Sequence, residues 1–130
     1  MNYRRPSMSD KQTCLLLVED DALVRMTVAL MLEDDGFGVV EASTAEEALG
    51  LMRGGLQAPV MVTDVDLGAG WNGMELADEL RALLPEMVIV FITGRMASLA
   101  GRTLGPREAV LPKPFEGAEL ARLVRSLVAR

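Results

Sequence analysis

The chain has 130 residues, 50% of them hydrophobic, and a formal net charge of −6, which fits one acidic domain with a well-filled core and argues against direct binding of nucleic acid. It contains no histidine, which excludes Ser-His-Asp and Cys-His catalysis and histidine-ligated metals. Its single cysteine forms no disulfide within the chain, and no apolar run approaches the roughly 18 residues that span a membrane, so we expect a cytoplasmic protein without membrane contact.

The N-terminal part of the chain contains a polar arm, a strand and a helix. Residues 1–13 are polar and are predicted to form a flexible arm that precedes a domain of residues 14–130. The apolar residues 15–18 predict a strand, which the acidic run Glu19-Asp20-Asp21 ends. Residues 22–36 predict a helix, in which the apolar residues at helical spacing are Leu23, Met26, Leu30 and Met31.

The rest of the chain continues this alternation. Further strands are predicted at residues 37–42, 60–64, 87–93 and 109–115, and further helices at residues 44–55, 73–85, 94–106 and 118–130. Thr44 and Glu47 form a T-x-x-E capping box at the start of one helix, and Asn72 caps another. The segment 94–106 has low helical propensity because it contains three glycines.

Five repeats of strand and helix predict an α/β fold, in which helices cover both faces of a parallel sheet. Right-handed crossovers leave few topologies for such a sheet. We expect a flavodoxin-like, doubly wound sheet of five strands in the order 2-1-3-4-5, with five helices.

Charged and polar residues follow four of the five predicted strands. The run Glu19-Asp20-Asp21 follows the first strand, Asp64 ends the third, Thr93 ends the fourth and Lys113 lies at the end of the fifth. Because the carboxyl ends of parallel strands share one edge, these side chains are expected to converge. Each alone is typical of a cap, a turn or a solvated side chain, but together they indicate an all-oxygen site suited to Mg²⁺ or Mn²⁺.

Four segments then resemble a known family. LLLVEDD, VMVTDVDL, VIVFITG and LPKPF are similar, in order and in spacing, to the four motifs of two-component response-regulator receiver domains. The resemblance covers the chain from residue 14 to the C-terminus. It implies a phosphoacceptor switch of a two-component or phosphorelay system.

The resemblance also implies a role for each site residue. Asp64 corresponds to the phosphoacceptor, which a sensor histidine kinase or a phosphotransfer protein would modify. The implied Mg²⁺ ligands are Glu19, Asp20, Asp64 and the backbone carbonyl of Asp66, and the implied phosphoryl contacts are Thr93 and Lys113. Asp21 is expected to cap the following helix.

Several positions depart from the family pattern or are expected to modulate the switch. Gly68 replaces the usual proline, and Val110 stands where many receivers carry a switch aromatic. Asp66 and Arg95 occupy positions that in this family face the attacking water, and we expect them to pair and to shield the phosphoryl group. We expect phosphorylation to order or shift residues 95–107, with little change at Val110.

The leading hypothesis is a stand-alone switch that catalyses only its own phosphorylation and dephosphorylation. Its output would be contact with an unknown protein target, or a homodimer, through residues 95–107, the fifth strand and the last helix. An aspartyl-phosphate phosphohydrolase is an alternative, because Asp66 lies where such enzymes place a general acid. A binding module that is not phosphorylated is a further alternative.

Overall fold

The computed structural model describes residues 12–129, so most of the predicted N-terminal arm lies outside the described residues. Its five strands form one parallel sheet in the order β2-β1-β3-β4-β5, which confirms the predicted topology. The strands are β1 (Cys14–Val18), β2 (Gly38–Ala42), β3 (Val60–Asp64), β4 (Val88–Thr93) and β5 (Glu108–Pro112). The helices are α1 (Ala22–Asp34), α2 (Ala45–Arg53), α3 (Gly73–Leu83), the 3₁₀ turn η2 (Met96–Leu99) and α4 (Gly117–Val128).

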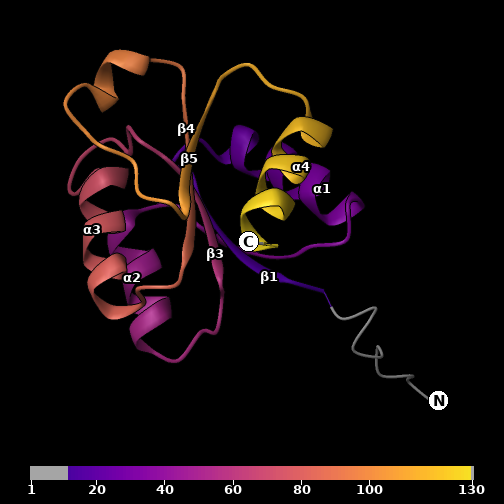
Figure 1. Cartoon of the computed structure of the whole chain (residues 1–130), viewed down its shortest axis with the longest axis horizontal. Coiled ribbons are helices and arrows are strands. Elements are labelled where there is room, and N and C mark those ends of the chain that lie inside the picture. Colours follow the sequence, from indigo (N-terminus) through magenta and orange to yellow (C-terminus); the bar gives the residue numbers. More distant parts are fainter. Residues whose placement is uncertain (1–11, 130) are drawn as a thin grey trace.

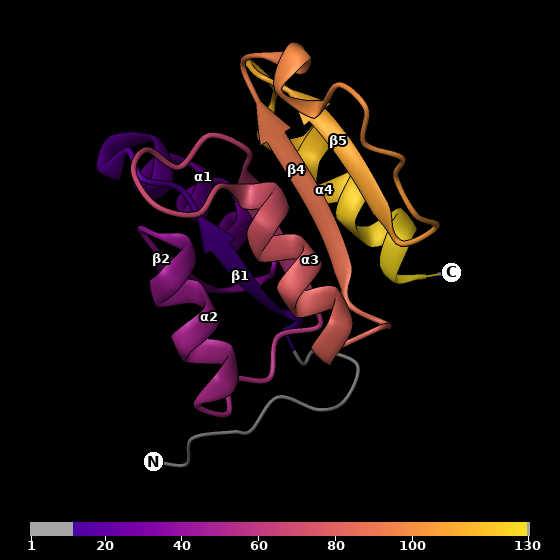
Figure 2. The ribbon, with the colours of Figure 1, turned by 90° about the vertical axis from the view of Figure 1, so that its left-hand side faces the viewer.

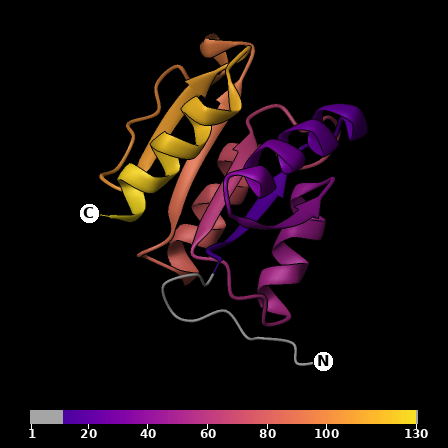
Figure 3. The ribbon, with the colours of Figure 1, turned by 90° about the vertical axis from the view of Figure 1, so that its right-hand side faces the viewer.

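The helices cover both faces of the sheet. Figure 1 shows the sheet between α2 and α3 on one side and α1 and α4 on the other. Figure 2 shows the α2 and α3 face, and Figure 3 the α1 and α4 face. Alternate residues of β1 enter the two halves of the core, since Leu15 and Leu17 pack with α1 and α4, while Leu16 and Val18 pack with α2 and α3. Every residue of β3 and β4 is buried, as expected for the central strands of a covered sheet.

Three of the four apolar residues at helical spacing in α1 lie on its exposed side. The residues that α1 buries are Val28, Ala29 and Leu32, whereas Leu23, Met26 and Leu30 are 73%, 54% and 59% exposed. The helix carries apolar residues on all its sides, so helical spacing alone does not show which side is buried. The buried residues face the crowded junction of α1 with the sheet and α4, where Gly117 comes so close that an added Cβ would lie 2.9 Å from the Met31 Cβ.

The predicted helix caps are present, with one change. Asp21 caps α1 by accepting a hydrogen bond from the Val24 N–H at 3.0 Å, and Asn72 forms a reciprocal capping box with Glu75. Thr44 accepts from the Glu47 N–H, but the Glu47 carboxylate accepts from the Ser43 N–H and hydroxyl. The predicted Thr44–Glu47 box is therefore only half formed.

The predicted helix at residues 94–106 is wrong, because the structure forms only the turn η2 there. Gly101 has a φ of +85°, which a continuous helix does not allow. The following Arg102 guanidinium lies 4.9 Å from the Phe91 ring centroid and donates to Asp78 at 3.0 Å. The Glu108 carboxylate, at the start of β5, accepts from the Gly105 N–H. These side-chain contacts hold an irregular segment against the sheet, so the fold has four α-helices and one 3₁₀ turn within residues 12–129.

Candidate functional site

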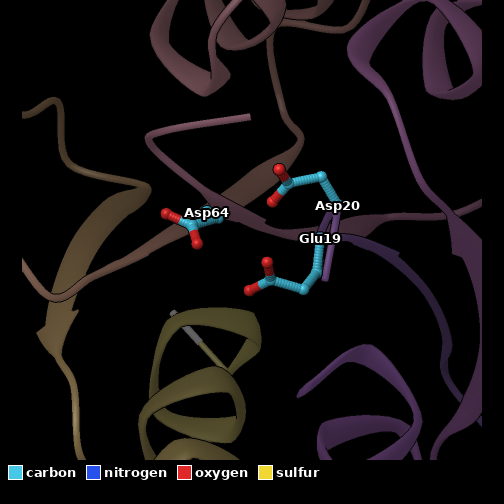
Figure 4. A group of neighbouring side chains, drawn as sticks. All are labelled: Glu19, Asp20 and Asp64. Carbon is cyan, nitrogen blue, oxygen red and sulfur yellow. The ribbon is translucent and has the colours of Figure 1, made fainter. Parts of the chain in front are cut away.

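Three carboxylates gather at the carboxyl edge of the sheet, as predicted. Glu19, Asp20 and Asp64 each offer an oxygen, and the three oxygens lie within 4.8 Å of one another. In Figure 4 these side chains surround one shared space, with Glu19 and Asp20 following β1 and Asp64 ending β3. Glu19 and Asp64 are buried, whereas Asp20 is exposed.

Lys113 supplies the cation of this cluster. Its Nζ donates to Asp64 Oδ2 at 2.7 Å and to Glu19 Oε1 at 2.9 Å. The lysine directly follows β5, which ends at Pro112 and is shorter than predicted, and the Lys113-Pro114 peptide bond is cis. The Lys113 N–H donates to the Thr93 carbonyl at 2.8 Å, which ties this loop to the end of β4.

The charges of the cluster are unbalanced. The pKa of Glu19 is raised to about 7, chiefly by burial and to a smaller extent by the charge of Asp64, while hydrogen bonds from Lys113 and the Asp21 N–H oppose the rise. Burial lowers the pKa of Lys113, but its bonds to Asp64 and Glu19 outweigh burial and leave the pKa raised. One ammonium thus faces three carboxylates, an arrangement that favours a further cation. The oxygen donors fit Mg²⁺, which prefers such ligands.

The backbone around Asp64 is held closely. The Asp66 N–H donates to Asp64 Oδ1 at 3.0 Å, and the Thr63 hydroxyl donates to the Asp64 carbonyl at 2.9 Å. Gly73, the first residue of α3, lies against the same carbonyl, where an added Cβ would be 2.1 Å from the oxygen. The start of α3 therefore packs directly on the end of β3 and fixes the position of Asp64.

Thr93 is fully buried at the end of β4. Its hydroxyl donates to the Arg95 carbonyl at 3.1 Å and accepts from the Arg95 N–H at 2.9 Å, so it closes a turn of its own loop. Val110 is half-buried in β5, opposite Phe91 of β4 in the strand register. Of these two residues, only Thr93 lies at the edge where the carboxylates meet.

The expected pair of Asp66 with Arg95 is not formed. Among residues 12–129, Arg95 makes no ion pair, and the Asp66 carboxylate instead accepts from the Ser98 hydroxyl at 3.2 Å and 3.4 Å. No pattern in the sequence indicated Ser98, because its position depends on the η2 turn, which replaced the predicted helix.

The loop between β3 and α3 forms one wall of the site. Gly68 has a φ of +75°, and an added Cβ there would lie 3.2 Å from Asp20 Oδ2, so glycine lets the loop close against this carboxylate. At the other end of the loop the Trp71 N–H donates to Glu46 of α2 at 3.2 Å. Trp71 itself is 38% exposed.

Comparison with known proteins agrees with this geometry. The family model described as the response regulator receiver domain matches residues 15–125. The chain belongs to this family. Receiver domains are the phosphoacceptors of two-component signalling, and this membership favours neither the phosphohydrolase nor the non-phosphorylated binding module. No helix in the described part of the chain is long and apolar enough to cross a membrane.

Relatives of this receiver domain are longer proteins. It is 34% identical over 120 residues to the sensor kinase CckA of Brucella abortus, a match that covers 89% of this chain and 12% of that protein. It is 30% identical over 119 residues to the aerobic respiration control protein ArcA of Escherichia coli K12, covering 89% of this chain and 48% of the relative. The chain therefore spans at most about half the length of these relatives.

Solved structures share the fold. A response regulator receiver protein from Sinorhizobium medicae is 28% identical with a TM-score of 0.84, and the match covers 92% of this chain and 96% of that one. The response regulator TrrA of Thermotoga maritima, solved in complex with Mg²⁺ and BeF, has a TM-score of 0.79 at 23% identity, over 89% and 99% of the two chains. At that identity the likeness shows the fold alone.

Proposed function

We propose that this receiver domain accepts a phosphoryl group on Asp64 from a sensor histidine kinase or a phosphotransfer protein. The observation that carries the proposal is the Lys113 ammonium, 2.7 Å from the Asp64 carboxylate in a cluster with Glu19 and Asp20. These three carboxylates and the Asp66 backbone carbonyl would hold Mg²⁺, or Mn²⁺ in its place. Bound Mg²⁺ would supply counter-charge for the phosphoryl oxygens.

The transfer exchanges one bond to phosphorus for another. As the nitrogen–phosphorus bond of the donor phosphohistidine breaks, an Asp64 carboxylate oxygen bonds to phosphorus, and the departing electron pair returns to the imidazole. Lys113 neutralises charge on the phosphoryl oxygens. Thr93 contributes a hydrogen bond once its hydroxyl leaves the Arg95 carbonyl, the acceptor that it contacts in this structure.

The exposed side of α1 is the proposed docking surface for the phosphodonor. Its apolar stripe consists of Leu23, Met26 and Leu30, each more than half exposed. The stripe begins two residues after Asp21, beside the carboxylates, so a partner seated on it is close to Asp64. An apolar surface that is left exposed, as this stripe is among residues 12–129, is typical of a protein contact site.

The proposed output surface consists of residues 95–107, β5 and α4. A protein target or a second copy of the chain would bind there. Val110 would occupy the position of the switch aromatic, although its side chain carries no ring. Arg95 would modulate hydrolysis of the phosphoryl group through its exposed charge. The domain would act in the cytoplasm, catalyse only its own phosphorylation and dephosphorylation, and make no contact with nucleic acid or membrane.

Acetyl phosphate tests the acceptor without a kinase. With Mg²⁺, intact mass spectrometry should show one added phosphoryl group on the wild type and none on Asp64→Asn. Asp34→Asn is a matched control, because Asp34 is an exposed residue at the end of α1. Equal labelling of Asp64→Asn and the wild type would refute the proposal.

A further inference from the structure

Ser98 is a half-buried polar residue to which the proposed function assigns no role. It lies in η2, after the strand that ends at Thr93. Its hydroxyl donates to the Asp66 carboxylate, 3.2 Å from Oδ2 and 3.4 Å from Oδ1. The contact joins the loop after β4 to the loop after β3, across 32 positions of sequence.

This contact completes a chain of hydrogen bonds around the acceptor. The Ser98 N–H donates to the Arg95 carbonyl at 2.9 Å, and the Thr93 hydroxyl donates to the same carbonyl at 3.1 Å. At the other end, the Asp66 N–H donates to Asp64 Oδ1 at 3.0 Å. Ser98 therefore connects the turn at Thr93 with the residue that contacts the Asp64 carboxylate.

The loop of residues 66–72 has few other anchors. It contains two glycines at positive φ, Gly68 and Gly70, so its backbone is intrinsically free to adopt other conformations. Within the described chain, Asp64 and Glu75 bond to the two ends of the loop as its neighbours in sequence. Side chains from distant segments hydrogen-bond to it at two points, Ser98 on Asp66 and Glu46 on the Trp71 N–H. Since Gly68 lies against Asp20, the Ser98 contact helps to set the position of one wall of the site.

We propose that Ser98 is a positioning residue that, through Asp66, prolongs the lifetime of the phosphoryl group on Asp64. This inference rests on the proposed function. In hydrolysis a water oxygen bonds to phosphorus, the bond from phosphorus to the Asp64 oxygen breaks, and its electron pair stays on the carboxylate, while the proton of the water passes to solvent. Water must approach in line with the breaking bond, and a loop held by Ser98 leaves it less room to do so.

The test measures loss of the phosphoryl group after labelling with acetyl phosphate and Mg²⁺ and removal of the donor. Ser98→Ala should hydrolyse about fivefold faster, the effect of losing one ordinary hydrogen bond at an exposed position. Ser98→Thr keeps the hydroxyl and should keep the wild-type rate. Ser126→Ala is the matched control, because among residues 12–129 the Ser126 hydroxyl bonds only within α4, to the Leu123 carbonyl.

Dependence on Asp66 separates positioning from a general loosening of the fold. In an Asp66→Ala background, Ser98→Ala should cause no further change, since the partner of the hydroxyl is already gone. A wild-type lifetime in Ser98→Ala, or the same acceleration in the Asp66→Ala background, would overturn the inference and leave the phosphoacceptor function intact. Failure of the wild type to accept a phosphoryl group would overturn both.

Discussion

Gly73→Ala should damage the site from a position outside it. An added Cβ at Gly73 would lie 2.1 Å from the Asp64 carbonyl oxygen, 3.0 Å from the Asp64 carbonyl carbon and 3.1 Å from the Thr63 hydroxyl. Because Cβ atoms rarely approach other atoms within 3.0 Å, α3 and the end of β3 must separate by about 0.9 Å or more. The obstacle is backbone, so a change of side-chain rotamer offers no relief.

This displacement should be measurable in two ways. Crowding of this kind costs about 1–3 kcal/mol, which lowers the thermal midpoint of a domain of this size by roughly 3–5 °C for each kcal/mol. Labelling by acetyl phosphate should slow by about tenfold to a hundredfold, since a shift near 1 Å misaligns the acceptor with Lys113. The N–H of residue 73, which donates to the Val65 carbonyl at 2.9 Å, is retained in the variant.

Gly50→Ala is the control for this experiment. Gly50 lies inside α2, is exposed, and has no atom within 4 Å of an added Cβ. Alanine should therefore stabilise the protein by about 0.5–1 kcal/mol and leave labelling unchanged. If Gly73→Ala unfolds at the wild-type temperature and labels at the wild-type rate, the reasoning from the close contact with Asp64 is wrong.

Four further predictions concern the other parts of the domain. Leu23→Ser should slow phosphotransfer from a histidine kinase about tenfold and leave labelling by acetyl phosphate unchanged, whereas Leu83→Ser, 53% exposed at the end of α3, should change neither. Because the pKa of Glu19 is raised from 4.5 to about 7, its contribution to stability without metal is present below 4.5 and lost as pH rises through 7. Mg²⁺ should thus raise the thermal midpoint more at pH 8 than at pH 6, and an equal rise would contradict this. Burial raises the pKa of Glu108, but the Gly105 N–H, Arg81 and Arg102 lower it more, so its stabilisation is present above the ordinary value of 4.5 and lost as pH falls through the lowered value. Glu108→Gln should accordingly cost about 1–3 kcal/mol in denaturant unfolding at pH 7, and less near pH 3. Beryllofluoride with Mg²⁺ should change hydrogen exchange in residues 95–107, and identical protection in both states would rule out a shift of this segment.

The sequence by itself determined the sheet, its order and the residues at its carboxyl edge. Asp64 and Lys113 were predictable because a parallel sheet brings the ends of its strands to one edge, whatever the details of packing. Local chemistry also identified the caps Asp21 and Asn72, since a cap depends on residues within one turn.

Only the tertiary structure decided which side of α1 is buried and which conformation the chain adopts after β4. The helix α1 carries apolar residues on all its sides. The packing of Val28 and Leu32 against the sheet decided which side is buried and left Leu23 exposed. After β4, the chain forms an irregular segment in place of a regular helix, and contacts of Arg102 with Asp78 and Phe91 hold this segment. Ser98 reaches Asp66 for the same reason, because that contact requires two loops to meet. Contacts between distant segments depend on how the elements pack together, and a local pattern of residues does not predict that packing.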